Sequence, residues 1–187
     1  MIKFIPNALS IYRIAAAPLL LFLTIFDEVN LFSWFLLASL VSDILDGLIA
    51  RTFHLQSELG ARLDSIGDMS TYLVALFGIF VFQKPFINEH LIGICFILGF
   101  YILQVIIALI KFQKITSFHT TLARITAYMQ GIFILVLFFF DFQYWMFYPT
   151  VLVSVLSYSE EILLTIILPE QQSNVGGLLR VMKTRSN

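Results

Sequence analysis

Six apolar stretches fill most of this 187-residue chain, at residues 11–26, 31–50, 63–82, 91–110, 121–140 and 145–168. A helix needs about 20 mostly apolar residues to cross a bilayer. Hydrophobic residues make up 59% of the chain and charged residues only 12%, whereas soluble domains are about 25% charged. We therefore expect an all-α integral membrane protein with six transmembrane helices.

The order of these stretches predicts one membrane domain over residues 1–187. Residues 9–168 would form the six-helix core. Residues 1–8, with Ile2, Phe4 and Ile5 beside Lys3, would form a short interfacial segment. Residues 169–187 are polar and would form a mobile or surface-lying tail. We expect the first stretch to remain as a helix, because it leads directly into further apolar stretches and carries no clear signal-peptide cleavage site.

The basic residues predict the orientation of the chain. An even number of helices places both termini on one side of the membrane, and Lys and Arg concentrate on the cytoplasmic side. Only Lys84 falls on the other side. The remaining ten are Lys3, Arg13, Arg51, Arg62, Lys111, Lys114, Arg124, Arg180, Lys183 and Arg185. Both termini are thus expected in the cytoplasm, in a multi-pass protein of the bacterial cytoplasmic membrane.

Two function classes are disfavoured by composition. The formal net charge is −1 and the isoelectric point is about 6.3, whereas a nucleic-acid binder normally carries a basic excess. Cys95 is the single cysteine, so neither an intrachain disulfide nor a cysteine metal cluster is expected.

Four aspartates interrupt the apolar pattern. Asp43 and Asp46 lie three apart, and Asp64 and Asp68 lie four apart, so each pair shares a helix face. Each carboxylate would cost about 2.5–3.5 kcal/mol near the bilayer centre. Two basic residues lie nearby, Arg51 and Arg62, and they are too few to offset this cost. We expect these aspartates to hold one or two divalent ions, since Mg²⁺ prefers a few carboxylates together with phosphate oxygens.

The residues around the aspartates favour a nucleotide diphosphate as ligand. Gly47 and Gly60 lack side chains, which lets a ligand approach the helix backbone closely. Arg51 lies one turn beyond Gly47 and is suited to pair with a phosphate. An alternative is that the aspartates are polar residues at the cytoplasmic helix ends that simply face water.

The pattern D-x2-D-G-x2-A-R-x8-G-x3-D-x3-D, read at these residues, resembles the signature of the CDP-alcohol phosphotransferase (CDP-alcohol phosphatidyltransferase) family. All eight fixed positions are filled, by Asp43, Asp46, Gly47, Ala50, Arg51, Gly60, Asp64 and Asp68. Six predicted spans and the Pro6-Asn7 pair before the first span also resemble the family.

The resemblance implies a transfer of a phosphatidyl group from a CDP-linked lipid, such as CDP-diacylglycerol, to an alcohol with release of CMP. It implies that the four aspartates bind Mg²⁺ or Mn²⁺ and that Asp68 is also the general base. Gly47, Ala50, Arg51 and Gly60, with Asn7, would bind the CDP group. A homodimer whose active site is open to the cytoplasm and to the lipid is also implied.

The acceptor alcohol is not fixed by the signature. Ser65 and Met69 depart from the proline and lysine of the phosphatidylglycerophosphate branch, and Ser65 is more similar to the phosphatidylserine branch. A cationic stretch nevertheless favours a phosphorylated acceptor such as glycerol 3-phosphate. Its candidate acceptor-binding residues are Lys111, Lys114, His119 and Arg124. The alternative acceptors are serine or inositol (phosphate). Separately, the cationic stretch could serve only to set the orientation of the chain.

Two rival functions and two further carboxylates complete the hypotheses. Intramembrane carboxylates also mark ion or proton carriers, but a carrier, like a non-catalytic scaffold, has no need of Gly47, Arg51 and Gly60 at this spacing. Glu160 and Glu161 lie in the sixth apolar stretch and point in different directions. Three places are open for them: near the active site or Arg124, in a dimer contact, or in a water-lined vestibule.

Overall fold

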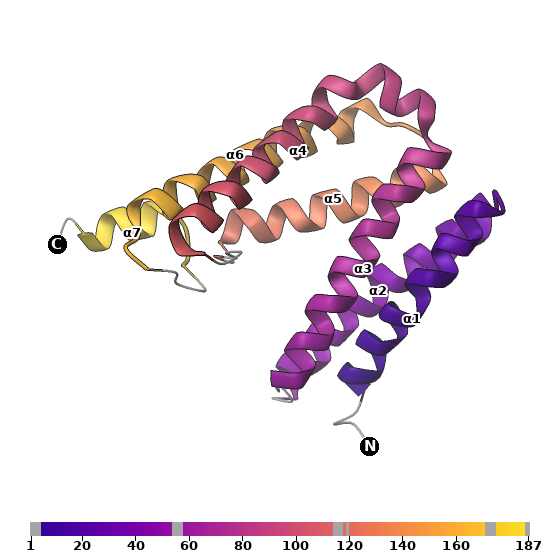
Figure 1. Ribbon diagram of the computed structural model, residues 1–187, viewed down its shortest axis with the longest axis horizontal. Helices are drawn as coiled ribbons and strands as arrows, with labels where there is room; N and C mark the ends of the chain where they lie inside the picture. The colour runs from indigo at the N-terminus through magenta and orange to yellow at the C-terminus, as the bar shows by residue number, and fades with distance from the viewer. Residues whose placement is uncertain (1–4, 54–57, 114–117, 119, 171–174, 186–187) are drawn as a thin grey trace. The chain divides into compact units, whose positions relative to one another are not determined.

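The computed structural model describes residues 5–53, 58–113, 118, 120–170 and 175–185. Over these residues the regular structure is entirely α-helical (Figure 1). The helices are α1 (Ile5–Ile25), α2 (Val29–Thr52), α3 (Glu58–Phe82), α4 (Lys84–Phe112), α5 (Thr121–Phe139), α6 (Tyr144–Ile167) and α7 (Leu178–Arg185). The chain forms two compact units, Met1–Asn88 and Glu89–Asn187.

The prediction of six transmembrane helices is confirmed. Helices α1 to α6 each contain a segment that is long and apolar enough to span a bilayer. The longest is α4, and only 11% of its apolar 18-residue segment is buried within the protein. Many large apolar side chains of these helices are exposed, among them Phe80, Ile92 and Ile110. Such a surface suits a lipid environment, because water would disfavour so much exposed apolar area.

The first unit is a bundle in which α1 packs along both α2 and α3. Its buried apolar side chains include Leu20 of α1, Phe32 and Leu36 of α2, and Val74 of α3. The Phe32 ring lies directly over Gly78, where a Cβ would overlap the ring. Helices α2 and α3 therefore approach closely at this point, as small residues permit in membrane bundles.

A short left-handed turn joins α1 to α2. Asp27 has a φ of 59°, and the Glu28 N–H donates to the Leu23 carbonyl at 2.9 Å. This is the six-to-one hydrogen bond of a Schellman motif, which ends a helix by satisfying its last carbonyls. Because the turn is so tight, α2 returns antiparallel beside α1.

Helix α4 changes conformation near its beginning. Pro85 is its second residue, a position in the first turn where a missing N–H costs no helical hydrogen bond. His90 departs from helical geometry, with φ −119° and ψ 21°. The boundary between the two units lies two residues before it.

The second unit contains the rest of α4 together with α5, α6 and α7. Thr120 caps α5 by accepting a hydrogen bond from the Ala123 N–H at 3.0 Å. Polar contacts also join α5 to α6. Gln130 Nε2 donates to Ser154 Oγ at 2.9 Å and to Tyr158 Oη at 3.1 Å. Hydrogen bonds of this kind hold transmembrane helices together in a medium that offers no water.

The C-terminal segment packs against other parts of the second unit, to which it belongs. Val175 is buried with Phe118, Leu164 and Leu168, and the Val175 N–H donates to the Phe118 carbonyl at 3.1 Å. Residues 178–185 form α7.

The expected N-terminal interfacial segment is covered only in part. Helix α1 begins at Ile5, so residues 5–8 belong to its first turn. Residues 1–4 lie outside the described residues. Pro6 is inside the first turn, where proline is well tolerated, and the start of α1 is thus earlier than the apolar pattern indicated.

Candidate active site

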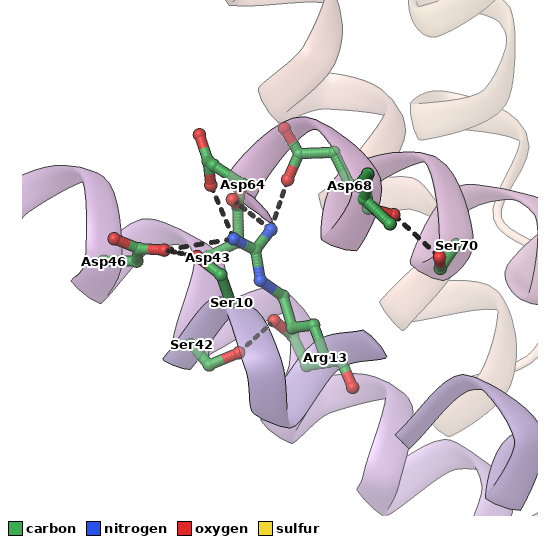
Figure 2. A network of polar contacts seen from close by, with 10 residues as sticks. Ser10, Arg13, Ser42, Asp43, Asp46, Asp64, Asp68 and Ser70 are labelled. Carbon is green, nitrogen blue, oxygen red and sulfur yellow. Dashed lines mark hydrogen bonds and ion pairs between the residues drawn. The ribbon is translucent and has the colours of Figure 1, made fainter. Parts of the chain in front are cut away.

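The four aspartates of the signature lie on two neighbouring helices. Asp43 and Asp46 are one turn apart on α2, and Asp64 and Asp68 are one turn apart on α3. Asp43, Asp64 and Asp68 each offer a carboxylate oxygen within 4.8 Å of the others. The helix spacing therefore brings together residues from both halves of the signature, as Figure 2 shows.

Arg13 of α1 lies in the middle of this acidic cluster. Its Nη1 atom is 2.7 Å from Asp43 Oδ1 and also pairs with Asp68 Oδ1. Its Nη2 atom is 2.6 Å from Asp64 Oδ1 and 3.2 Å from Asp46 Oδ2. One guanidinium group thus contacts all four carboxylates, which its planar fork of donors makes possible.

The burial of these groups is very unequal. The Arg13 side chain is 1% exposed, and that of Asp46 is 6% exposed, whereas the side chains of Asp43, Asp64 and Asp68 are 44%, 43% and 52% exposed. A buried guanidinium needs paired carboxylates to offset its desolvation. The side chains of the other three aspartates are about half exposed, so a ligand can reach them.

The role of Arg13 corrects one step of the sequence interpretation. The sequence pattern indicates only Arg51 and Arg62 as nearby compensating charges, and it assigns Arg13 solely to orientation. The contacts of Arg13 span 30 to 55 residues along the chain, so local spacing gave no indication of them. The available signal was a charged residue inside an apolar helix, since such residues are costly and mark functional sites.

Ser10 distinguishes Asp46 from the other three aspartates. Ser10 lies one turn before Arg13 on α1, and its hydroxyl donates to Asp46 Oδ2 at 2.5 Å. The same Asp46 oxygen contacts Arg13. Asp46 is therefore held by α1 at a buried position, outside the group of three carboxylates whose oxygens converge.

Gly67 makes room for the Arg13 side chain on α3. A Cβ at Gly67 would lie 3.3 Å from Cζ and 3.4 Å from Nε of Arg13. These distances are tighter than ordinary van der Waals contact. Gly67 lies between Asp64 and Asp68 in sequence, so the absence of its side chain lets the guanidinium reach both.

The chain matches a known protein family over the residues that form this acidic cluster. A family model described as CDP-alcohol phosphatidyltransferase matches residues 3–156, which include Arg13, both aspartate pairs and all of α1 to α5. The chain belongs to this family. The family resemblance identified from the signature is therefore confirmed, and the six apolar helices agree with a membrane-bound CDP-alcohol phosphatidyltransferase.

Two curated relatives carry more specific names. The chain is 39% identical over 64 residues to a cardiolipin synthase (CMP-forming) / mitochondrial hydrolase fusion protein of Schizosaccharomyces pombe, over 34% of this chain and 11% of that protein. It is 34% identical over 76 residues to a CDP-diacylglycerol--glycerol-3-phosphate 3-phosphatidyltransferase of Cereibacter sphaeroides, over 38% of this chain and 34% of that protein. The matches span about a tenth and about a third of these relatives. No solved structure matches the chain significantly.

The remaining signature positions lie on the same helices as the aspartates. Gly47 and Ala50 follow Asp46 on α2, and Gly60 is in the first turn of α3. Arg51 is in the last turn of α2, but its side chain lies outside the described residues. Asn7 is in the first turn of α1 and is partly buried.

The candidate acceptor residues belong to the second unit, and two of them are described. Lys111 donates from Nζ to the Ile166 carbonyl at 2.9 Å, so it satisfies a carbonyl near the C-terminus of α6, as cations commonly do. Arg124 is exposed in the first turn of α5. Lys114 and His119 lie outside the described residues.

The adjacent glutamates of α6 have different surroundings, as expected for neighbouring helical residues. Glu160 Oε1 accepts a hydrogen bond from the Leu178 N–H at the start of α7. Glu161 is buried on the helix face that also carries Ser154, Ser157 and Thr165. The contact of Glu160 with the C-terminal segment differs from the three places that the sequence predicts for the two glutamates.

The chemistry of the acidic cluster fits a divalent metal ion of the kind implied by the family. Asp43, Asp64 and Asp68 provide converging carboxylate oxygens, which are hard ligands suited to Mg²⁺ or Mn²⁺. With all groups ionised, four carboxylates and one guanidinium leave an excess of three negative charges. The cluster can therefore accommodate further positive charge in addition to Arg13.

Proposed function

We propose that this protein transfers a phosphatidyl group from a CDP-linked lipid, such as CDP-diacylglycerol, to an alcohol and releases CMP. The observation that carries the proposal is the convergence of Asp43, Asp64 and Asp68 from α2 and α3, within a chain that belongs to this family. The ion-carrier alternative is disfavoured because it does not account for the complete signature.

The signature residues supply the binding groups. Asp43, Asp64 and Asp68 hold the metal, and Asp46, fixed by Ser10, completes the acidic cluster. Mg²⁺ or Mn²⁺ at this position would neutralise charge on the pyrophosphate and on departing CMP. Gly47, Ala50, Arg51 and Gly60, with Asn7, bind the CDP group. Because the glycines lack side chains, the CDP group can approach the helix backbone closely. The arginine pairs with one of its phosphates.

Asp68 is the general base of the proposed reaction. It is the most exposed of the four aspartates, so an acceptor hydroxyl can come within hydrogen-bond reach. Asp68 takes the hydroxyl proton while the hydroxyl oxygen forms a bond to the phosphorus that carries the lipid. The bond from that phosphorus to the bridging oxygen breaks, and CMP leaves with the bond's electron pair.

Glycerol 3-phosphate is the acceptor that we favour. The relative from Cereibacter sphaeroides is named for that acceptor, and a phosphorylated alcohol suits the cationic residues of the stretch 111–124. Lys114 and Arg124, with His119, are the proposed acceptor-binding groups, whereas Lys111 already contacts the α6 carbonyl.

Cardiolipin formation is the second candidate function. It is favoured by the identity to the Schizosaccharomyces pombe protein, which is named a CMP-forming cardiolipin synthase. The chemistry at the phosphorus is the same, but the acceptor is then the glycerol hydroxyl of phosphatidylglycerol. This candidate predicts a lipid acceptor and no requirement for a soluble one.

The proposed setting is a homodimer in a bacterial cytoplasmic membrane with its active site open to the cytoplasm. The distribution of basic residues supports this orientation. The exposed apolar surface of α4 is available to lipid or to a second copy.

The test is CMP release by the purified protein in mixed micelles with CDP-diacylglycerol. Glycerol 3-phosphate, phosphatidylglycerol, serine, inositol and inositol phosphate are offered separately. We expect CMP with glycerol 3-phosphate, and we expect Lys114→Gln and Arg124→Gln to raise the acceptor KM far more than the CDP-lipid KM. CMP release with phosphatidylglycerol alone would favour the second candidate.

A matched pair of variants tests the base. Asp68→Asn should reduce kcat by about 100-fold or more, which is the lower range of general-base effects. Asp141→Asn, at an exposed turn position with a φ of 61°, should leave turnover unchanged. Absence of CMP release with every acceptor would refute the proposed reaction, and near-normal turnover of Asp68→Asn would refute the role of Asp68.

A further inference from the structure

Arg13 pairs with the same three carboxylates that a metal ion would use. All three converging carboxylates contact its guanidinium through Oδ1, with Asp43 and Asp68 on Nη1 and Asp64 on Nη2 (Figure 2). A divalent ion bound by these aspartates needs oxygens from the same small group. The resident arginine and the metal therefore draw on the same three carboxylates.

Two cations at one carboxylate cluster oppose each other. A divalent ion raises the local positive charge beside a guanidinium that is 1% exposed, where screening by water and salt is weak. The carboxylates must also divide their lone pairs between the two cations. Each cation consequently weakens the binding of the other, and this coupling is reciprocal.

The position of Arg13 is built into the bundle. Gly67 provides the surface on which the side chain lies, and Ser10 holds Asp46 beside Nη2. Asp46 is buried and lies outside the converging three. Arg13 can therefore keep Asp46 as a partner when it releases the other aspartates.

We infer that Arg13 is an internal counter-cation that occupies the acidic cluster in the metal-free protein and gives up Asp43, Asp64 and Asp68 to the metal. Arg13 thereby sets the metal affinity of the site and keeps the three helices together without metal. The inference rests on the proposed metal site and adds a residue outside the signature to it.

Metal binding measured without turnover tests this inference. Free Mn²⁺ is quantified by electron paramagnetic resonance during titration of the purified protein. Arg13→Gln removes one positive charge from contact with the ligands, so the Kd for Mn²⁺ should fall by about tenfold or more. The same variant should lose thermal stability without metal and gain more from added Mg²⁺ than the wild type does.

Two control variants separate charge from other effects. Arg13→Lys keeps the charge and should bind Mn²⁺ within about threefold of the wild type, because an ammonium group also repels the metal. Lys84→Gln removes an exposed charge elsewhere in the first unit and should leave the Kd unchanged. If Arg13→Gln folds only with metal present, the measurement on the wild-type protein described next decides.

The wild-type protein provides a direct measurement. With ¹⁵N-labelled arginine, the Nη signals of Arg13, assigned by their absence in Arg13→Lys, should shift when Mg²⁺ is added. Unchanged Nη signals, or an Arg13→Gln Kd equal to or weaker than that of the wild type, would overturn the inference and leave the proposed reaction intact. No Mn²⁺ binding by the wild type would overturn both this inference and the proposed metal site. Metal binding that depends on Arg13 without any CMP release would refute only the reaction.

Discussion

Glu160 Oε1 on α6 accepts a hydrogen bond from the backbone N–H of Leu178 at 2.9 Å, which attaches the first residue of α7 to a transmembrane helix. Gly177 precedes this contact with a φ of 132°, and a Cβ there would lie 3.1 Å from the same oxygen. A carboxylate at the beginning of a helix satisfies an N–H group that lacks an intrahelical partner. Glu160 thus acts on the C-terminal segment.

Removal of this contact should release α7. Glu160→Ala loses the cap, and a cap contributes about 1 kcal/mol to helix stability. The open population of α7 should rise about fivefold, and limited trypsin digestion should cut after the exposed Arg180 faster by a similar factor. Glu160→Gln, which keeps an acceptor oxygen, should be intermediate. Glu170→Ala, at an exposed carboxylate, is the control, and equal cleavage rates for the two alanine variants would contradict the cap.

A methyl group at Gly67 should disturb the acidic cluster. Gly67→Ala places a Cβ 3.3 Å from the Arg13 guanidinium carbon, and overpacking of this kind costs about 1–3 kcal/mol. We expect a lower thermal midpoint in detergent and reduced CMP release. Gly99→Ala meets no atom within 4 Å and should be neutral or slightly stabilising. Equal midpoints for the two variants would show that Arg13 does not lie against Gly67.

Substitution of Arg51 by lysine should affect the CDP-lipid selectively. Lysine retains the charge but lacks the planar fork that suits a phosphate. We expect the CDP-diacylglycerol KM to rise about tenfold, with the acceptor KM unchanged, in initial-rate measurements of CMP release. Arg180→Lys provides a control at an exposed arginine of α7. An acceptor KM that rises by the same factor would place Arg51 at a different ligand.

Removal of divalent metal should abolish turnover. Metal ions supply several kcal/mol of charge stabilisation in phosphoryl chemistry, so excess EDTA should lower CMP release by at least about 100-fold. Added Mg²⁺ or Mn²⁺ in excess of the chelator should restore it. Calcium–EDTA, which leaves little free chelator, is the control for nonspecific effects. Full activity in excess EDTA would exclude a metal requirement.

The helices and the convergence of three aspartates were predictable because both depend on local spacing. Apolar runs near 20 residues specify spans, and positions three or four apart share a helix face. The chain order then placed the Asp43 helix next to the Asp64 helix. The beginning of α1 at Ile5 was missed, since apolar pattern alone does not detect a first turn that contains Pro6 and Asn7.

Contacts between distant segments were not predictable in the same way. Arg13 reaches Asp68 over 55 residues, and Glu160 reaches Leu178 over 18 residues. Both depend on how helices pack and not on a periodic pattern. Charged residues inside apolar helices were the one general indication of them, and that indication identifies a residue without naming its partner.

The position of Arg13 on the first helix has a consequence for biosynthesis. Chains are made from the N-terminus, so α1 is available before α2 and α3 emerge. The aspartates of α2 can therefore enter the bilayer in the presence of a cation on the preceding helix, which lowers the cost of their insertion. A shortened chain that begins after α1 would contain the whole signature yet lack this partner, and its aspartate-bearing helices should insert less efficiently.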